Sequence, residues 1–179
     1  PGLKIAVRVY NYAQVSPNTL RQAQDEAARI FREIGIEIGW MDCTPSAKPQ
    51  PEPACVHPLG PLDLILRVHS RIAFAGAGFR DTALGFSLLT ADQRPSAYAT
   101  VFYDCVREFA ERQELSEAQI LAYAIAHEFG HLLLNTMGHS PLGLMRARWS
   151  RDDLLRALRF TPAQAALIRA NLQRRKLSV

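Results

Sequence analysis

The stretch that decides the fold is "AIAHEFGHLLLNTMGHSPLGLM", residues 124–145. It holds three of the chain's five histidines: His127, His131 and His139. The residues before it, from Ser116 onward, are typical of a helix, and Ser116 with Gln119 three positions later predicts a capping box. A spacing of four then puts His127 and His131 on one helix face, close enough to share a metal ion.

Glu128 directly follows the first of these histidines in the pattern H-E-x-x-H. Its side chain projects beside the two imidazoles, where it can hold a metal-bound water as a general base without being a ligand. The alternative is a helix with two buried histidines in ordinary hydrogen bonds. The apolar surround, which includes Ala124, Ile125 and Phe129, disfavours that alternative because bare imidazoles and a carboxylate are costly to bury there.

A catalytic zinc site usually has three protein ligands and a water, so a third ligand is needed. No glutamate occurs after Glu128, which leaves His139 as the first candidate. In a continuous helix His139 would lie about 12 Å beyond His131 along the axis. We therefore predict that the helix stops near Leu134 and that the chain folds back.

Asn135 and Gly138 both tolerate the left-handed backbone that such a bend requires. Asp152 or Asp153 is the alternative third ligand. We expect the remaining histidines, His57 and His69, to be ordinary surface or structural residues. "HSPLGLM" then turns through Pro141 and Gly143 to Met145, which we predict to form an apolar floor under the metal site.

The first half of the chain alternates strands and helices. "LKIAVRVY" (3–10), a helix from Ser16–Pro17 to Ile34 and "IEIGWM" (36–41) predict a βαβ unit with parallel strands. Three further strands are expected at 62–70, 83–90 and 98–104, with an irregular proline-rich loop at 43–61. Helices are expected at 105–113, at 150–159 and from Thr161, capped by Gln164, to about Lys176.

Composition predicts one domain over 1–179, with the sheet and active-site helix in 1–134 and the bend, methionine turn and C-terminal helices in 135–179. No apolar run approaches the roughly 20 residues of a membrane span. The net charge is +4 and basic residues are dense from Arg146 to Lys176. No aromatic stacking pattern accompanies them, so we expect a solvated helix face and no nucleic-acid partner. Oligomeric state is not legible, and a monomer is the default.

Cys43 and Cys55 flank the proline-rich loop, and we expect a disulfide between them, with unpaired thiols as the alternative. A disulfide indicates an oxidising compartment. The chain begins at Pro1 without methionine, which suits a mature exported form and equally an expressed fragment. The expected location is therefore secreted or cell envelope, otherwise cytoplasmic.

His127, Glu128, His131, a bend, His139 and a methionine turn resemble the metzincin zinc metallopeptidases. The string HExxHLLL…HSxxGxM, with Arg146 and Trp149 following, is similar to small bacterial proteins of that type. Metzincins usually have H-E-x-x-H-x-x-G-x-x-H, whereas here Leu134 holds the glycine position and His139 comes two residues late. The tyrosine that some members carry after the methionine is absent.

The resemblance implies an α+β zincin fold. It has a twisted mixed sheet of about five strands with one antiparallel edge strand, packed on a helix and the active-site helix and followed by a short helical part. It also implies one zinc ion, and a peptide or protein substrate that pairs with the edge strand at Leu84, Gly85, Phe86 and Ser87.

The first functional hypothesis is a zinc-dependent peptidase with Glu128 as general base. The alternatives are an inactive zinc-containing binding module of the same fold and a basic nucleic-acid-binding domain.

Overall fold

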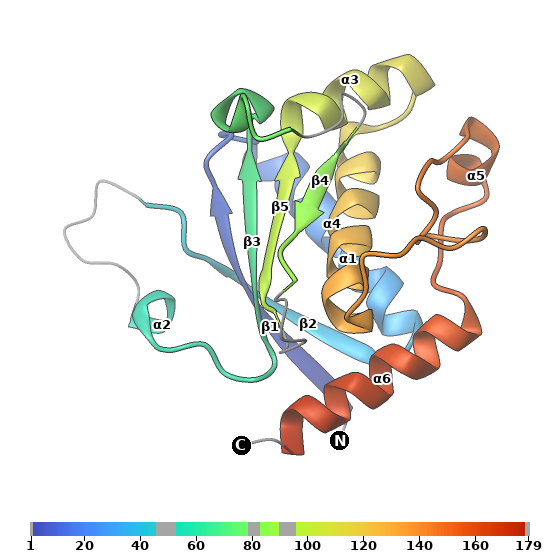
Figure 1. The fold of residues 1–179 in the computed structure, drawn as a ribbon. Coiled ribbons are helices and arrows are strands. Elements are labelled where there is room, and N and C mark those ends of the chain that lie inside the picture. The colour runs from blue at the N-terminus through green and yellow to red at the C-terminus, as the bar shows by residue number, and fades with distance from the viewer. Residues whose placement is uncertain (1, 46–52, 79–82, 90–95, 178–179) are drawn as a thin grey trace.

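The protein is described by a computed structural model covering residues 2–45, 53–78, 83–89 and 96–177. A five-stranded sheet is flanked by helices (Figure 1). The elements, in chain order, are β1 (Leu3–Asn11), α1 (Pro17–Glu33), β2 (Ile36–Asp42), α2 (Pro53–Val56), β3 (Asp63–His69), the 3₁₀ helix η1 (Arg71–Phe74), β4 (Gly85–Ser87), β5 (Tyr98–Phe102), α3 (Tyr103–Gln113), α4 (Glu117–Leu134), α5 (Arg151–Leu155) and α6 (Pro162–Leu177).

The sheet has the order β2-β1-β3-β5-β4. β1 is parallel to both β2 and β3, and β3 is parallel to β5. β4 alone runs antiparallel, and it lies at the edge beside β5. The predicted βαβ unit and the mixed sheet with one antiparallel edge strand are therefore confirmed.

α1 and α4 pack against each other on one face of the sheet (Figure 1). Alternation along β1 turns Ile5, Val7 and Val9 toward these helices, and all three are buried. α4 is buried over almost its whole length. The helix that carries the candidate site is thus the centre of the hydrophobic core, which fixes its position relative to the sheet.

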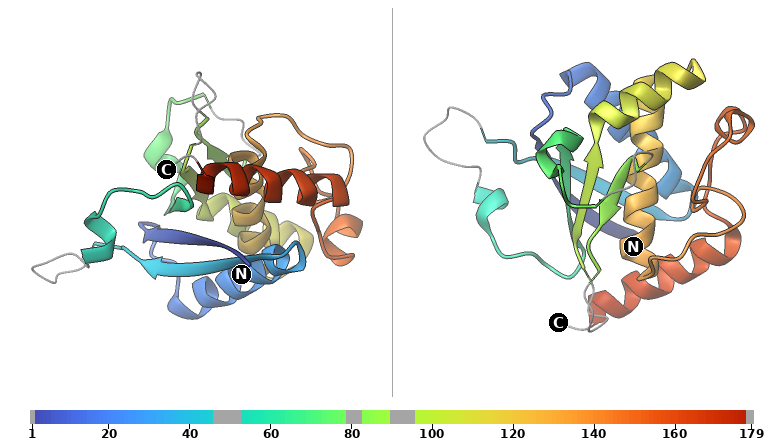
Figure 2. Two further views of the ribbon diagram at one scale, coloured as in Figure 1. Left: turned by 90° about the horizontal axis from the view of Figure 1, so that it is seen from below. Right: turned by 45° about the horizontal axis from the view of Figure 1, so that its top comes forward.

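α6 crosses the end of α4, as the view from below in Figure 2 also shows. The Asn171 side chain donates to the Leu133 carbonyl at 2.8 Å, and the buried Arg175 guanidinium donates to the Leu132 carbonyl. These are carbonyls of the last helical turn, which have no partner within the helix. The C-terminal helix therefore satisfies the end of α4 where the chain bends away.

Two helix predictions need correction. Ser116 is the N-cap of α4 but its hydroxyl makes no capping hydrogen bond, so the predicted box with Gln119 is wrong. The helix predicted over 150–159 ends at Leu155, because Ala157 adopts a left-handed φ of 61° that breaks it. The Thr161–Gln164 box is confirmed by reciprocal bonds of 2.9 and 3.3 Å.

The strand predicted over 83–90 is shorter in the structure. β4 holds only Gly85, Phe86 and Ser87, with hydrogen bonds from Phe102 N to Leu84 O and from Leu88 N to Tyr98 O at its ends. Residue 90 lies outside the described residues. The predicted irregular loop at 43–61, described except for 46–52, contains the one-turn helix α2.

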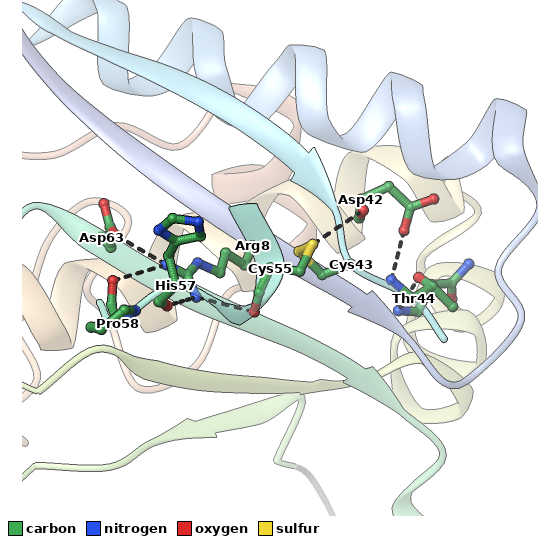
Figure 3. The surroundings of a disulfide bond; sticks show 9 residues. Arg8, Asp42, Cys43, Thr44, Cys55, His57, Pro58 and Asp63 are labelled. Carbon is green, nitrogen blue, oxygen red and sulfur yellow. Dashed lines mark hydrogen bonds and ion pairs between the residues drawn. A yellow bond between two sulfur atoms is a disulfide. The ribbon is translucent and has the colours of Figure 1, made fainter. Parts of the chain in front are cut away.

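Cys43 and Cys55 form a disulfide, with their Cα atoms 5.6 Å apart (Figure 3). The neighbouring segment is also held by Arg8, whose guanidinium donates to the carbonyls of Cys55, His57 and Pro58 at 3.2, 2.7 and 3.3 Å. Arg8 projects from the face of β1 opposite α4. The disulfide and the arginine together fasten this excursion to the face of the sheet opposite α4.

We expect reduction of the disulfide to cost about 2–3 kcal/mol of unfolding free energy, because the bond closes a short loop. Urea unfolding with and without dithiothreitol measures this cost. A Cys43→Ser/Cys55→Ser variant should show the same loss and no further response to reductant, whereas Cys105→Ala, at the buried free thiol, should keep the response. An unchanged transition midpoint on reduction of the wild type would contradict the expectation.

Candidate metal centre

The helix carrying the motif ends where the sequence predicts. α4 stops at Leu134, and Asn135 caps it with φ 54° and ψ 48°. Asparagine tolerates this left-handed conformation better than most residues. Gly138, the other candidate for the bend, does not have positive φ. Asn135 therefore turns the chain back toward the motif.

The bend brings three imidazoles together. His127, His131 and His139 each offer a nitrogen, and these atoms all lie within 4.8 Å of one another. The His139 ring centroid is 5.3 Å from that of His127 and 5.0 Å from that of His131. His127 and His131 are buried, whereas His139 is exposed and closes the group from the solvent side.

The hydrogen bonds of the two helical histidines fix which nitrogen faces the group. His127 Nδ1 donates to the Leu144 carbonyl at 2.9 Å, and His131 Nδ1 donates to the Thr136 carbonyl at 2.7 Å. A neutral ring with a proton on Nδ1 carries its lone pair on Nε2. Both lone pairs therefore point into the space that His139 also faces.

The two Nε2 atoms lie only 3.1 Å apart. Two lone pairs at that separation repel unless a cation lies between them. In a tetrahedral site with Zn–N bonds of about 2.0–2.1 Å, two ligand nitrogens are about 3.3 Å apart. The donor set, its spacing and the carbonyl partners that orient the rings thus fit a zinc ion.

Burial keeps these imidazoles neutral. It lowers the pKa of His127 to about 4, although the hydrogen bond to Leu144 opposes the shift, and it also lowers the pKa of His131. Both rings can therefore accept a metal at neutral pH without first losing a proton. The alternative ligand Asp153 is not in the group, since it accepts from Ser150 and pairs with Arg146 at 2.7 Å.

Glu128 lies beside the histidines and only 6% of it is exposed. Burial raises the pKa of its carboxyl to about 7, against the opposing effect of a hydrogen bond from Ser87. The Ser87 hydroxyl is 2.7 Å from Glu128 Oε2 and 2.8 Å from the Glu128 main-chain oxygen. A carboxyl with a pKa near neutrality suits a group that must both accept and return a proton.

Ser87 therefore contacts Glu128 through its side chain, which the sequence does not predict. The sequence predicts it only as part of a strand whose backbone pairs with substrate. In the structure the Ser87 side chain faces α4. Gly85 lies on the same side of the strand, and a Cβ added at Gly85 would lie 3.3 Å from Glu128 Oε1. Phe86 points to the other face of the strand, where it contacts Phe74 and Phe102.

Met145 packs directly under the motif. It is 1% exposed, and its sulfur would lie 2.3 Å from a Cβ placed on Gly130. The same Cβ would lie 2.9 Å from Cε1 of Phe160. The glycine between Glu128 and His131 is thus required by the close approach of Met145 and Phe160.

We expect Gly130→Ala to destabilise the fold by about 1–3 kcal/mol, the usual cost of overpacking a filled core. Urea unfolding measures the loss. Gly39→Ala is the matched control, because its Cβ would meet only the mobile end of Lys4 at 3.4 Å and a backbone oxygen at 3.9 Å. Equal stability of the two variants would show that the contact with Met145 does not constrain α4.

The other histidines stay apart from the group, as expected. His69 stacks on Tyr12 with ring centroids 4.5 Å apart, and the His57 carbonyl accepts from Arg8.

The chain is similar in fold to two solved structures. It matches the archaemetzincin of Methanopyrus kandleri with a TM-score of 0.60 and 15% identity, over 96% of each chain. The chain has an archaemetzincin-like zincin fold. It also matches a zinc-dependent peptidase of Methanocorpusculum labreanum with a TM-score of 0.53 and 15% identity, over 93% of this chain and 99% of that one. No protein-family model matches the chain, and no curated protein sequence matches it significantly.

Proposed function

We propose that the protein is a zinc-dependent peptidase that holds one zinc ion with His127, His131 and His139. The observation that carries the proposal is the group of three imidazoles, with the Nε2 atoms of His127 and His131 3.1 Å apart beside a buried carboxyl. The zincin fold supports it, since one of the two structural neighbours is an archaemetzincin and the other is described as a zinc-dependent peptidase.

A zinc ion at this position would lower the pKa of a water to about 7 and polarise a peptide carbonyl. Glu128 would take the proton from the attacking water and pass it to the amine nitrogen that leaves. The Ser87 hydroxyl can hydrogen-bond Glu128 both before and after this proton transfer. When Glu128 is ionised, the Ser87 hydroxyl can donate to Oε2, and when Glu128 is protonated, the same hydroxyl can accept from it and donate to the Glu128 main-chain oxygen.

We expect Ser87→Ala to lower kcat about tenfold while KM and zinc affinity stay the same, because the loss falls on the orientation of Glu128 and not on a ligand. Ser87→Thr keeps the hydroxyl and should restore most of the rate. Steady-state kinetics and zinc titration measure the three values. A kcat for Ser87→Ala equal to the wild-type value would remove Ser87 from this role.

The substrate we propose is an extended peptide or a protein segment. Within the described residues β4 pairs only with β5 and is the last strand of the sheet, which is the position where an added strand would pair. Leu84 to Ser87 would then bind substrate through their backbone while the inner face of the strand holds Glu128.

None of the helices in the described part of the chain combines the length and the hydrophobicity that a membrane span requires.

Cleavage of fluorescein-labelled casein, with and without 1,10-phenanthroline, tests the function. We expect cleavage that the chelator abolishes and that added Zn²⁺ restores. A zinc-loaded, folded protein that leaves casein and a mixed peptide library intact would favour the alternative, a zinc-containing binding module of the same fold. The disulfide also leads us to propose a secreted or cell-envelope location.

A further inference from the structure

Trp149 lies beside the candidate metal centre, and the mechanism above does not use it. Its indole Nε1–H donates to the Leu144 carbonyl at 3.1 Å. The same carbonyl accepts the Nδ1–H of His127 at 2.9 Å. A carbonyl oxygen has two lone pairs, so one oxygen bridges the tryptophan and the candidate ligand.

The indole ring also touches the ligand directly. It meets the His127 ring edge to face, with centroids 5.6 Å apart and an interplanar angle of 81°. It meets Tyr123, one turn earlier on α4, in the same way at 6.1 Å and 71°. Trp149 therefore packs against both Tyr123 and His127 of α4.

We propose that Trp149 is a positioning residue for the metal centre. It acts through the Leu144 carbonyl, which it holds in the orientation that accepts His127 Nδ1–H, and so keeps His127 Nε2 turned toward the metal. Leu144 lies in an irregular segment, and its N–H donates to the Arg159 carbonyl at 2.8 Å. Loss of such an outer partner typically weakens metal binding about 10–100-fold.

The inference rests on the proposed zinc site but not on hydrolysis. Because the Trp149 N–H donates to the Leu144 carbonyl, it is not free to donate to a substrate oxygen.

The first test is titration of the metal-free protein with Zn²⁺ alone. Trp149→Phe keeps an aromatic ring and removes the N–H, and we expect its zinc dissociation constant to rise about tenfold or more. Trp40→Phe is the matched control. Trp40 also packs on α4, against Phe129, but its buried Nε1 has no hydrogen-bond partner among the described residues. Its zinc affinity should equal that of the wild type.

The second test uses the wild-type chain, so it does not depend on the stability of a variant. The sequence contains two tryptophans, which give two indole N–H signals in a ¹⁵N–¹H spectrum. Zn²⁺ should shift the Trp149 signal and slow its exchange with solvent, and should leave the Trp40 signal in place.

Two results would overturn the proposal: a zinc affinity of Trp149→Phe equal to that of Trp40→Phe, or a Trp149 signal unmoved by saturating Zn²⁺. Neither readout requires catalysis. A protein that binds zinc as described but cleaves nothing would refute the peptidase and leave the role of Trp149 standing, whereas a protein that binds no zinc would refute both.

Discussion

Glu128→Gln is expected to abolish peptide cleavage and to leave zinc binding unchanged. The amide has nearly the shape of the carboxyl but cannot take a proton from water, and a positioned general base contributes roughly 10²–10⁴-fold to the rate. Ser87 can hydrogen-bond an amide as well as a carboxylate, since its hydroxyl both donates and accepts. The variant should therefore fold and hold its metal normally.

The measurements are casein cleavage and zinc stoichiometry on the same sample. Glu117→Gln is the matched control, because Glu117 lies on the same helix and accepts from Tyr103 at 2.6 Å, outside the histidine group. It should cleave at the wild-type rate. Cleavage by Glu128→Gln at the rate of the control would remove Glu128 from its proposed role.

His139→Ala is expected to remove most of the zinc affinity without disturbing the metal-free fold. His139 is exposed, so its side chain adds little to the core. Because His139 is the proposed third ligand, its removal should lower the zinc affinity by more than the roughly 10–100-fold that follows loss of a residue that only hydrogen-bonds a ligand. Zinc that binds only the folded state raises its stability, by about 2.7 kcal/mol at 100 times the dissociation constant.

Thermal unfolding with and without Zn²⁺ measures this effect. The wild type should melt at a higher temperature with zinc, and His139→Ala should show little or none of that rise. His57→Ala, at another exposed histidine, should respond to zinc as the wild type does. A full zinc-dependent rise in His139→Ala would mean that another side chain completes the site.

Much of the fold could be predicted because its determinants are local. The Ser16 N-cap, the periodicity of α1 and the short connection to β2 predict a parallel βαβ unit, and the structure contains it. The end of α4 followed from a distance argument: His139 can reach the helical pair only if the helix stops near Leu134. Local chemistry then supplied Asn135 as a residue able to make the turn.

The surroundings of the site could not be predicted, because they come from segments far apart in the sequence. Ser87 reaches Glu128 across 41 positions, and which face of a three-residue strand it occupies depends on the register with β5. Leu144 contributes only a backbone oxygen, which leaves no trace in the residue type. Trp149 was visible as a tryptophan near the motif, but its partner was not.

Tertiary contacts also explain why the helix after Trp149 is shorter than the sequence predicts. The segment 150–159 has a helical pattern, yet its helix ends at Leu155 and Ala157 has a left-handed φ. The Arg159 carbonyl accepts from Leu144 N at 2.8 Å. That bond ties the segment around Leu144 and Met145 to the segment before α6. Local helical preference is overridden where the backbone is needed to support the candidate site.

The most direct test of the central claim is a crystal structure of the zinc-loaded protein with anomalous data collected at the zinc edge. The account predicts one strong peak, bound by nitrogens of His127, His131 and His139 at about 2.0–2.1 Å. A zinc-loaded crystal with no peak among these three residues, or with His139 turned away from the metal, would contradict it.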